Sequence, residues 1–170
     1  FRAEGFHYST PSFSFLSRRP ATLGKLTVSP AGGGSEMAAG AVVLRRVAER
    51  TVELTRAEAA QKQVRLELEV PASAVTVRGD ADQLASLALN VAVNAFKALG
   101  PRGGVLRVTV AQSGGEASLT LENDGPPLPE VERSRLFAPF YSDSQGTGLG
   151  LSIAARIAEQ HGGSIFAENA

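Results

Sequence analysis

The chain has 170 residues, of which 43% are hydrophobic, and this is enough for one domain with a buried core. Seventeen basic and seventeen acidic side chains cancel, so the net charge does not favour nucleic acid or an anionic membrane as a partner. The chain has no cysteine, which excludes disulfides and thiolate metal sites and fits a reducing cytosol, and no apolar run approaches the ~20 residues of a membrane span.

Residues 1–35 differ from the rest of the chain, being rich in Ser, Pro, Gly and Phe. The run at 29–35 contains three consecutive glycines and is typical of a flexible linker. We therefore predict a domain boundary at residue 35. Periodicity and turn residues then predict the remaining elements. In chain order they are a helix from near Glu36 to about Lys62, strands at 64–70 and 75–78, a helix at 81–99, a hairpin of strands at 105–111 and 117–122, a short helix at 130–136, a helix at 151–161 and a strand at 164–167.

The helix predicted at 81–99 is apolar over most of its circumference, which indicates that it is buried. It carries a polar stripe in which Asn90, Asn94 and Lys97 fall within about 60° of one another. An unpaired buried polar group costs ~1–3 kcal/mol, so something polar must lie against the stripe. A ligand is one candidate. The backbone of a neighbouring loop is the other, with Lys97 then extending to water, and the helix alone does not decide between them.

Three alternating glycines, Gly146, Gly148 and Gly150, come directly before the helix predicted at 151–161. Glycine backbone can approach a bulky anion, and the free N–H groups of a helix N-terminus stabilise a phosphate. Taken by itself, the same stretch also fits a flexible turn that lets the helix pack.

Four stretches occur in a fixed order along the chain. They are LNVAVNAFKAL at 89–99, NDGPPLP at 123–129, LFAPFY at 136–141 and GTGLGLSIAARIAEQHGG at 146–163. Together they resemble the N, G1, F and G2 boxes of the ATP-binding catalytic domain of sensor histidine kinases. The resemblance covers roughly residues 36–170. It implies the Bergerat-type α/β (α+β) fold, a two-layer sandwich in which a mixed, mostly antiparallel sheet packs on about three helices. Gyrase-type ATPases, the heat-shock chaperone and mismatch-repair ATPases share this fold.

The resemblance supplies a partner for the polar stripe, namely the phosphates and magnesium of Mg-ATP. It implies that the amide oxygen of Asn94 binds the magnesium, as suits a hard cation. Asn90 would hold a metal-bound water or a phosphate, and Lys97 would contact phosphate oxygens as a point charge. These three are the expected catalytic residues.

The nucleotide-binding residues implied by the resemblance lie in the two glycine-containing boxes. Asn123 stands where the family usually has an aspartate that accepts a hydrogen bond from the adenine amino group, and Gly125 lets the chain pass close to the base. The backbone expected to close over the phosphates is that of Gly146, Thr147, Gly148, Leu149 and Gly150.

Three features depart from the family pattern. The Asn123 amide oxygen is still an acceptor, but the amide also carries donors, and the neighbouring Asp124 is an alternative acceptor. Pro127 replaces the usual second glycine of its box and stiffens the turn. The lid at 142–145 has no Lys or Arg for the γ-phosphate, and Asp143 adds a like charge, which indicates low affinity.

The region that would carry the phospho-accepting histidine does not match the family motif. His7 lacks the family's surrounding residues, and His161 sits at a predicted helix C-terminus, where the helix dipole favours a cation. Residues 14–20 resemble the end of a dimerisation helix. We therefore expect 1–35 to be a remnant of that helix plus a linker, and 36–170 to be a catalytic domain truncated before its last strand.

The resemblance thus predicts a catalytic domain that binds Mg-ATP and supplies the γ-phosphate for histidine autophosphorylation in a two-component sensor kinase. Alone it would be inactive. The implied partners are a dimerisation and phospho-acceptor domain and a response-regulator receiver domain, within a homodimeric kinase. We expect a cytoplasmic location, in a full-length kinase that can be membrane-anchored, with no nucleic-acid partner and no membrane contact by this segment.

Two other functions are compatible with the same fold. A degenerate, non-catalytic module for nucleotide sensing or protein interaction stays open, because the lid has no basic residue to favour the kinase. An ATPase of the gyrase or chaperone branch is disfavoured, because the lid is too short to form a dimerisation clamp.

Overall fold

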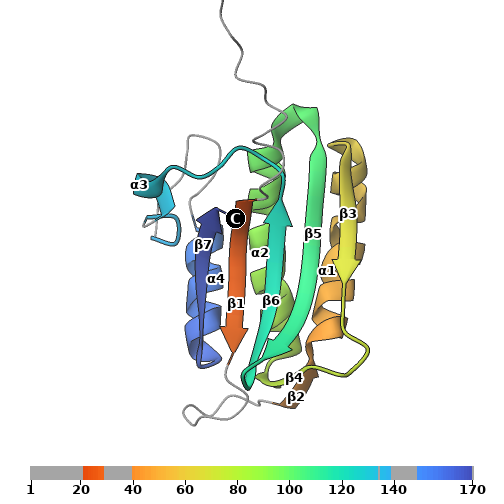
Figure 1. Ribbon diagram of the computed structural model, residues 1–170, viewed down its shortest axis with the longest axis vertical. Helices are drawn as coiled ribbons and strands as arrows, with labels where there is room; N and C mark the ends of the chain where they lie inside the picture. Colours follow the sequence, from red (N-terminus) through yellow and green to blue (C-terminus); the bar gives the residue numbers. More distant parts are fainter. Residues whose placement is uncertain (1–20, 29–39, 134, 139–148, 170) are drawn as a thin grey trace, which may run out of the picture.

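A five-stranded sheet covered on one face by helices forms the body of the protein in the computed structural model, which describes residues 21–28, 40–133, 135–138 and 149–169 (Figure 1). The elements in chain order are β1 (Ala21–Val28), β2 (Gly40–Val43), α1 (Leu44–Gln61), β3 (Val64–Glu69), β4 (Thr76–Gly79), α2 (Ala81–Leu99), the 3-10 helix η2 (Gly100–Arg102), β5 (Gly104–Ser113), β6 (Glu116–Asn123), α3 (Glu130–Arg133), α4 (Gly150–Gln160) and β7 (Gly163–Asn169).

The strand order in the large sheet is β3-β5-β6-β1-β7. β3 pairs with β5 in parallel, whereas the other neighbouring pairs are antiparallel. β2 and β4 form a separate two-stranded sheet at one end. Helices α1, α2 and α4 lie behind the large sheet in Figure 1, with α2 between the other two. The predicted two-layer sandwich with a mixed, mostly antiparallel sheet is confirmed.

Helix α2 is the centre of the core. Asp80 caps it, because its Oδ1 accepts hydrogen bonds from the backbone N–H groups of Asp82 and Gln83, both at 2.9 Å. Residues 81–102 are long and apolar enough to cross a membrane by length and composition. Within this domain, however, that apolar surface packs against the sheet and the flanking helices. The buried residues of α2 are Leu84, Ala85, Leu87, Ala88, Val91, Ala92, Ala95, Phe96 and Leu99.

Strand β6 contributes buried side chains to the core along its whole length. Its alternate side chains Ala117, Leu119 and Leu121 are buried, as expected for a strand with one face on the helices. Asn123 is the next inward position and the last residue of the strand, and it is 1% exposed. The row of core side chains therefore ends in a buried amide.

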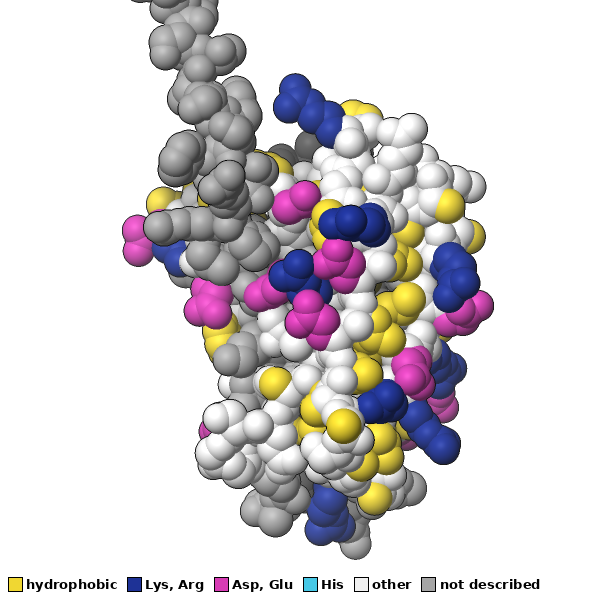
Figure 2. Space-filling view, turned by 45° about the vertical axis from the view of Figure 1, so that its right-hand side comes forward, with side chains coloured by type: hydrophobic (Ala, Val, Ile, Leu, Met, Phe, Trp, Pro, Cys, Tyr) yellow, Lys and Arg dark blue, Asp and Glu magenta, His cyan; other side chains and the backbone are white. Residues whose placement is uncertain are grey.

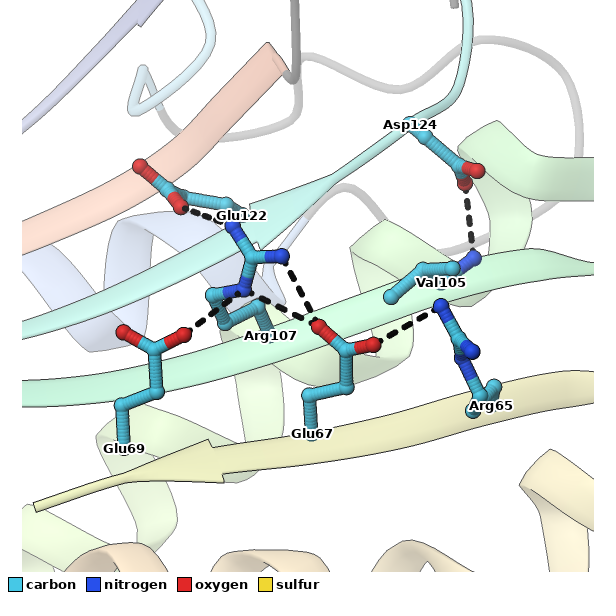
Figure 3. Close-up of polar contacts among 7 residues, drawn as sticks. All are labelled: Arg65, Glu67, Glu69, Val105, Arg107, Glu122 and Asp124. Atoms are coloured by element: carbon cyan, nitrogen blue, oxygen red, sulfur yellow. Dashed lines mark hydrogen bonds and ion pairs between the residues drawn. The ribbon is translucent and has the colours of Figure 1, made fainter.

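The opposite face of the sheet carries a charged cluster around Arg107 of β5 (Figure 3). Arg107 donates from Nε and Nη2 to Oε2 of Glu67, at 3.0 and 2.9 Å. It also lies 3.2 Å from Glu69 and 3.8 Å from Glu122, and Arg65 lies 2.8 Å from the other oxygen of Glu67. The hydrogen bond to Glu67 is the main reason why the pKa of Arg107 is raised above its ordinary value, with these carboxylates adding to it. The cluster ties β3, β5 and β6 together.

The surface charge is evenly mixed. Figure 2 shows basic and acidic side chains interleaved over the front of the molecule, with apolar side chains between them. This distribution agrees with the net charge of zero and produces no extended patch of one sign on that face.

Strand β1 corrects the prediction for part of the N-terminal segment. Residues 21–28 belong to the stretch predicted as a helix remnant and linker, yet they form a strand that pairs with β6 on one side and β7 on the other. The nearest residue that they pair with along the chain is Ala117. Because the two strands are so far apart in sequence, no local pattern predicts that they pair. The rest of 1–35 lies outside the described residues, and the boundary at 35 stays a prediction there.

Two element boundaries also differ from the sequence predictions. The first helix begins at Leu44 rather than near Glu36, because residues 40–43 form β2 and pair with β4. The N–H of Leu44 then donates to the carbonyl of Val75 at 2.9 Å, which fixes the start of α1. The short helix predicted at 130–136 is the four-residue α3.

Candidate functional site

The two asparagines of the α2 stripe are oriented by the backbone of their own helix. Asn90 Nδ2 donates to the carbonyl of Ser86 at 2.9 Å, and Asn94 Nδ2 donates to the carbonyl of Asn90 at 2.8 Å. Because a carbonyl can only accept, the atom that faces it must be the nitrogen. Neither Oδ1 accepts a hydrogen bond from any residue that the structure describes. The stripe therefore offers two half-buried acceptors.

Among the described residues, the amide donors of the stripe bind the carbonyls of α2 itself. The loop at 139–148 lies outside the described residues, so the interpretation in which the stripe binds a neighbouring loop stays a prediction. The stripe is also less buried than predicted, since Asn90 and Asn94 are half-buried and Lys97 is exposed. Lys97 lies less than one turn beyond Asn94, so its ammonium group can reach the same end of the site.

The start of α4 lies against this stripe. A Cβ added to Gly150 would lie 2.9 Å from Oδ1 of Asn90 and 3.7 Å from Nδ2 of Asn94, so only glycine permits this approach without displacement. Leu149 is the N-cap of α4, and its side chain makes no capping hydrogen bond. The free N–H groups of the first turn of α4 are thus placed close to the acceptors of α2.

Asn123 ends β6, and the turn that follows it packs against the C-terminal end of α2. Asn123 Oδ1 accepts a hydrogen bond from the N–H of Gly125 at 3.0 Å. Its Nδ2 is buried and has no hydrogen-bond partner within the described parts of the chain. A Cβ on Gly125 would lie 2.9 Å from Asn123 Oδ1 and 3.4 Å from the carbonyl of Ala98, so the turn packs directly on the C-terminal end of α2.

Two further side chains hold this turn in place. Asp124 Oδ1 accepts from the N–H of Val105 at 2.7 Å, which fastens the turn to β5. One oxygen of Asp124 is therefore engaged in the fold, and the alternative in which Asp124 reads the base stays a prediction that depends on its other oxygen. Asn169 of β7 donates to and accepts from the backbone of Leu128, both at 2.8 Å. The sequence analysis missed Asn169, because its partner is 41 positions away and no local pattern marks the pair.

His161 has a structural role at the other end of α4. Its Nε2 accepts from the N–H of Asp80 at 3.0 Å, and its Nδ1 lies 2.7 Å from the carbonyl of Ile157. With Nε2 accepting from Asp80, Nδ1 is the ring nitrogen that can donate to Ile157. His161 thus links the C-terminal end of α4 to the start of α2.

The structure places two of the predicted segments against α2, which carries Asn90, Asn94 and Lys97. Gly150 at the start of α4 lies against Asn90, and Gly125, just after Asn123 at the end of β6, lies against Ala98 one turn beyond Asn94. That these residues form one site stays a prediction. In the described ranges, no group of three or more His, Asp or Glu residues could hold a metal ion, so the available oxygen donors are amides. Gly146, Thr147, Gly148, the lid at 142–145 and His7 lie outside the described residues.

Comparison with known proteins points to one family. A family model described as "Histidine kinase-, DNA gyrase B-, and HSP90-like ATPase" matches residues 79–170. The chain is 33% identical to the sensor histidine kinase ZraS of Klebsiella oxytoca over 131 residues, which are 76% of this chain and 28% of ZraS. It is 38% identical to the sensory histidine kinase/phosphatase NtrB of Escherichia coli O157:H7 over 133 residues, 72% of this chain and 38% of NtrB.

A solved structure, that of the mycobacterial sensor histidine kinase MprB, superposes with a TM-score of 0.65 at 28% identity, covering 76% of this chain and 94% of that chain. The chain spans less than two fifths of the length of ZraS and of NtrB. The matched residues include α2, the turn after β6 and α4, which are the segments that form the site. The chain therefore belongs to the family of histidine kinase-, DNA gyrase B- and HSP90-like ATPases.

Proposed function

We propose that this chain binds Mg-ATP at the end of the sandwich where α2, α4 and the turn after β6 meet, and presents the γ-phosphate to a histidine on another domain. The observation that carries the proposal is the start of α4 lying against Asn90 and Asn94, whose amide oxygens accept no hydrogen bond within the described parts of the chain. Acceptors for a cation and donors for a phosphate lie next to each other, which is what a metal-bound triphosphate requires.

The residues present fit a magnesium ion. Mg²⁺ takes oxygen ligands and usually keeps several waters, with one or two protein ligands and substrate phosphates completing its shell. Asn94 Oδ1 would be such a ligand, and Asn90 Oδ1 would hold a metal-bound water or a phosphate oxygen. When bound, the ion neutralises charge on the phosphates.

The chain's own contribution is to position and neutralise. Lys97 would contact phosphate oxygens from the exposed end of the stripe, and the N–H groups at Leu149 and Gly150 would bind the phosphates, together with Gly146, Thr147 and Gly148. Asn123 and Gly125 would hold the base. Phosphoryl transfer depends on positioning and charge stabilisation more than on covalent chemistry, so these groups are sufficient for the donor half of the reaction.

The acceptor half of the reaction would come from a dimerisation and phospho-acceptor domain, with a response-regulator receiver domain as the next partner, in a cytoplasmic part of a homodimeric kinase. The relatives named as sensor histidine kinases support this assignment. Because the chain matches only 28% and 38% of their lengths, these activities belong to a larger assembly.

Calorimetric titration with Mg-ATP, Mg-ADP and ATP plus chelator tests the proposal. We expect Mg-ATP and Mg-ADP to bind, and the chelator to weaken ATP binding by about tenfold or more, since the amide oxygens lose the cation that links them to the phosphates. Absence of binding to all three would contradict the proposal.

Incubation with labelled ATP tests whether the phospho-accepting histidine lies on another domain. The chain should not label itself, because His161 is committed to the Asp80 N–H and the region of His7 lacks the family motif. Acid-labile phosphate on either histidine would contradict this assignment. A chain that binds Mg-ATP but never phosphorylates a supplied phospho-acceptor domain would instead be the nucleotide-sensing module, which the lack of Lys and Arg at 142–145 favours.

A further inference from the structure

Strand β3 has one edge that no other described strand occupies. It is the first strand in the order β3-β5-β6-β1-β7, and Figure 1 draws no described segment beyond it on the side away from β5. An edge strand presents a row of unpaired N–H and C=O groups that can pair with a further strand. Proline and β-bulges commonly prevent such pairing, but β3 contains no proline and its register with β5 is continuous.

The register with β5 determines which residues face the open edge. The N–H of Gly104 donates to the carbonyl of Gln63 at 3.4 Å, and Val64 lies opposite Gly104 in the parallel pair. In a parallel pair, the backbone groups of successive residues point alternately to the two sides of the strand. The carbonyl of Gln63 points to β5. The backbone groups of Val64, Leu66 and Leu68 therefore point to the open edge.

The side chains of β3 divide into an apolar set and a charged set. Leu66 and Leu68 lie on the face toward the helices, where Leu66 is partly buried against the core and Leu68 is 36% exposed. Arg65 and Glu67 lie on the other face, with their charged groups 2.8 Å apart (Figure 3). The edge therefore carries apolar surface on one face and two opposite charges, two residues apart, on the other.

We propose that two copies of this chain associate by antiparallel pairing of their β3 strands, about a two-fold axis at Leu66. In this register Leu66 faces Leu66 of the second copy, and Val64 faces its Leu68, in hydrogen-bonded pairs. Arg65 lies opposite Glu67 of the second copy and Glu67 lies opposite its Arg65, because the two-fold axis makes the contacts reciprocal. This inference goes beyond the proposed function and does not depend on the nucleotide site.

Backbone direction and charge together favour this register. Only residues whose backbone groups point outward can exchange hydrogen bonds, so the alternative registers differ by shifts of two residues. A shift in one direction places Arg65 opposite Arg65 of the second copy. A shift in the other direction places Arg65 opposite Glu69, but it also places Glu67 opposite Glu67. Like charges directly opposite each other are destabilising, so the register centred on Leu66 is the one of these three without such a pair.

Analytical ultracentrifugation of the whole chain tests whether the copies associate. A single strand pair is a small interface, so we expect a weak dimer whose average mass rises from one chain toward two between about 10 μM and 1 mM at low ionic strength. The mass of a single chain at every concentration would overturn the inference.

Charge reversal tests whether the association uses this edge. Arg65→Glu and Glu67→Arg each place like charges opposite each other in both reciprocal contacts, so each should raise the dissociation constant of the dimer by about tenfold or more. An equal mixture of the two variants restores opposite charges, and native mass spectrometry should show a mixed dimer. Arg156→Glu, at an exposed position of α4 on the other side of the sandwich, is the matched control and should dimerise as the parent does. Dimers that neither reversal weakens, or a mixture without mixed dimers, would overturn the inference.

Hydrogen exchange gives a measurement that needs no substitution. The N–H groups of Leu66 and Leu68 should exchange more slowly as the protein concentration rises, whereas the N–H of Glu67, which points to β5, should exchange at an unchanged rate. Exchange at Leu66 and Leu68 that does not depend on concentration would overturn the inference. Slow exchange at both positions in a monomer would do so as well, because another segment of the same chain would then occupy the edge. If a charge-reversed protein does not fold, as judged by circular dichroism, this measurement decides alone.

Discussion

The asparagines of α2 and the asparagine of β6 use their amides in opposite ways. In α2, both nitrogens are bound to helix carbonyls, and neither oxygen has a partner among the residues that the structure describes. At the end of β6, the oxygen is bound to a backbone N–H, and the nitrogen has no partner in the same described ranges. The same side chain is thus turned into an acceptor in one region and a donor in the other by the backbone group beside it.

This difference gives the site two chemically distinct ends. The α2 end suits a cation, because free amide oxygens are ligands for hard metal ions. The β6 end differs, because the buried Asn123 nitrogen is a donor that has no partner in the described parts of the chain. The following substitutions test this difference between the two ends of the site.

Gly150→Val should have the largest effect, because it forces α4 away from the acceptors of α2. The added side chain begins 2.9 Å from Asn90 Oδ1, closer than real Cβ contacts, and we expect a loss of about 2 kcal/mol in the free energy of unfolding, as for an overpacked core. Urea denaturation measures it. Combining it with Asn90→Ala should recover part of the loss if the clash is with that side chain. A Gly150→Val protein as stable as the parent would contradict the close approach.

Asn94→Ala should remove an acceptor while leaving the fold intact. Alanine is the better helix former, so we expect the free energy of unfolding to change by less than about 1 kcal/mol. Mg-ATP affinity should fall by about tenfold or more, and the remaining binding should no longer respond to chelator. Calorimetry with and without chelator measures both. Ser86→Ala is the matched control, because Ser86 lies on the same face of α2 as Asn94. Unfolding of Asn94→Ala, or unchanged binding, would show that the stripe is structural.

Asp124→Ala should affect stability more than ATP affinity. It leaves the N–H of Val105 without its acceptor, which costs about 1 kcal/mol of unfolding free energy. The affinity for Mg-ATP should stay within about twofold of the parent, since Asn123 and Gly125 keep their places. Thermal denaturation and calorimetry measure the two quantities. A marked loss of ATP affinity in a folded variant would assign the base reading to Asp124 instead.

Arg107→Met should have the smallest effect. The cluster lies on the outer face of the sheet and its members are partly exposed to solvent, so the loss should be within about 1 kcal/mol and should shrink at high salt. Nucleotide affinity should not change, because the cluster is on the face away from the helices. Denaturation at low and high salt measures the first quantity and calorimetry the second. An altered affinity would show coupling through the sheet.

The sequence carried enough local information to predict the helices and the hairpin. The polar stripe of α2 is visible because Asn90, Asn94 and Lys97 recur at helical spacing, and the Asp80 cap has a side chain suited to its position. The hairpin turn falls at Gly114 and Gly115, as their composition indicates.

What the sequence could not provide were the pairings between distant segments. The place of β1 between β6 and β7, and the contacts between Asn169 and Leu128, depend on chain segments that meet only after folding. Which atom of Asn123 is free likewise depends on the path of the turn, since it is Gly125 N–H that fixes the amide. The residue types predicted a site with polar side chains, whereas the backbone geometry determined which atom of each amide is bound by the backbone.

The register of β1 has a consequence for how the chain can be connected. In the antiparallel pair with β7, Ala21 lies opposite Asn169 and Val28 lies opposite Gly163. The beginning of one strand is thus beside the end of the other, close enough to be joined by a tight turn. A circularly permuted chain, with residues 21–28 placed after Asn169, would build the same strand order from a different connectivity. For this sheet, the strand between β6 and β7 can be supplied from either direction along the chain.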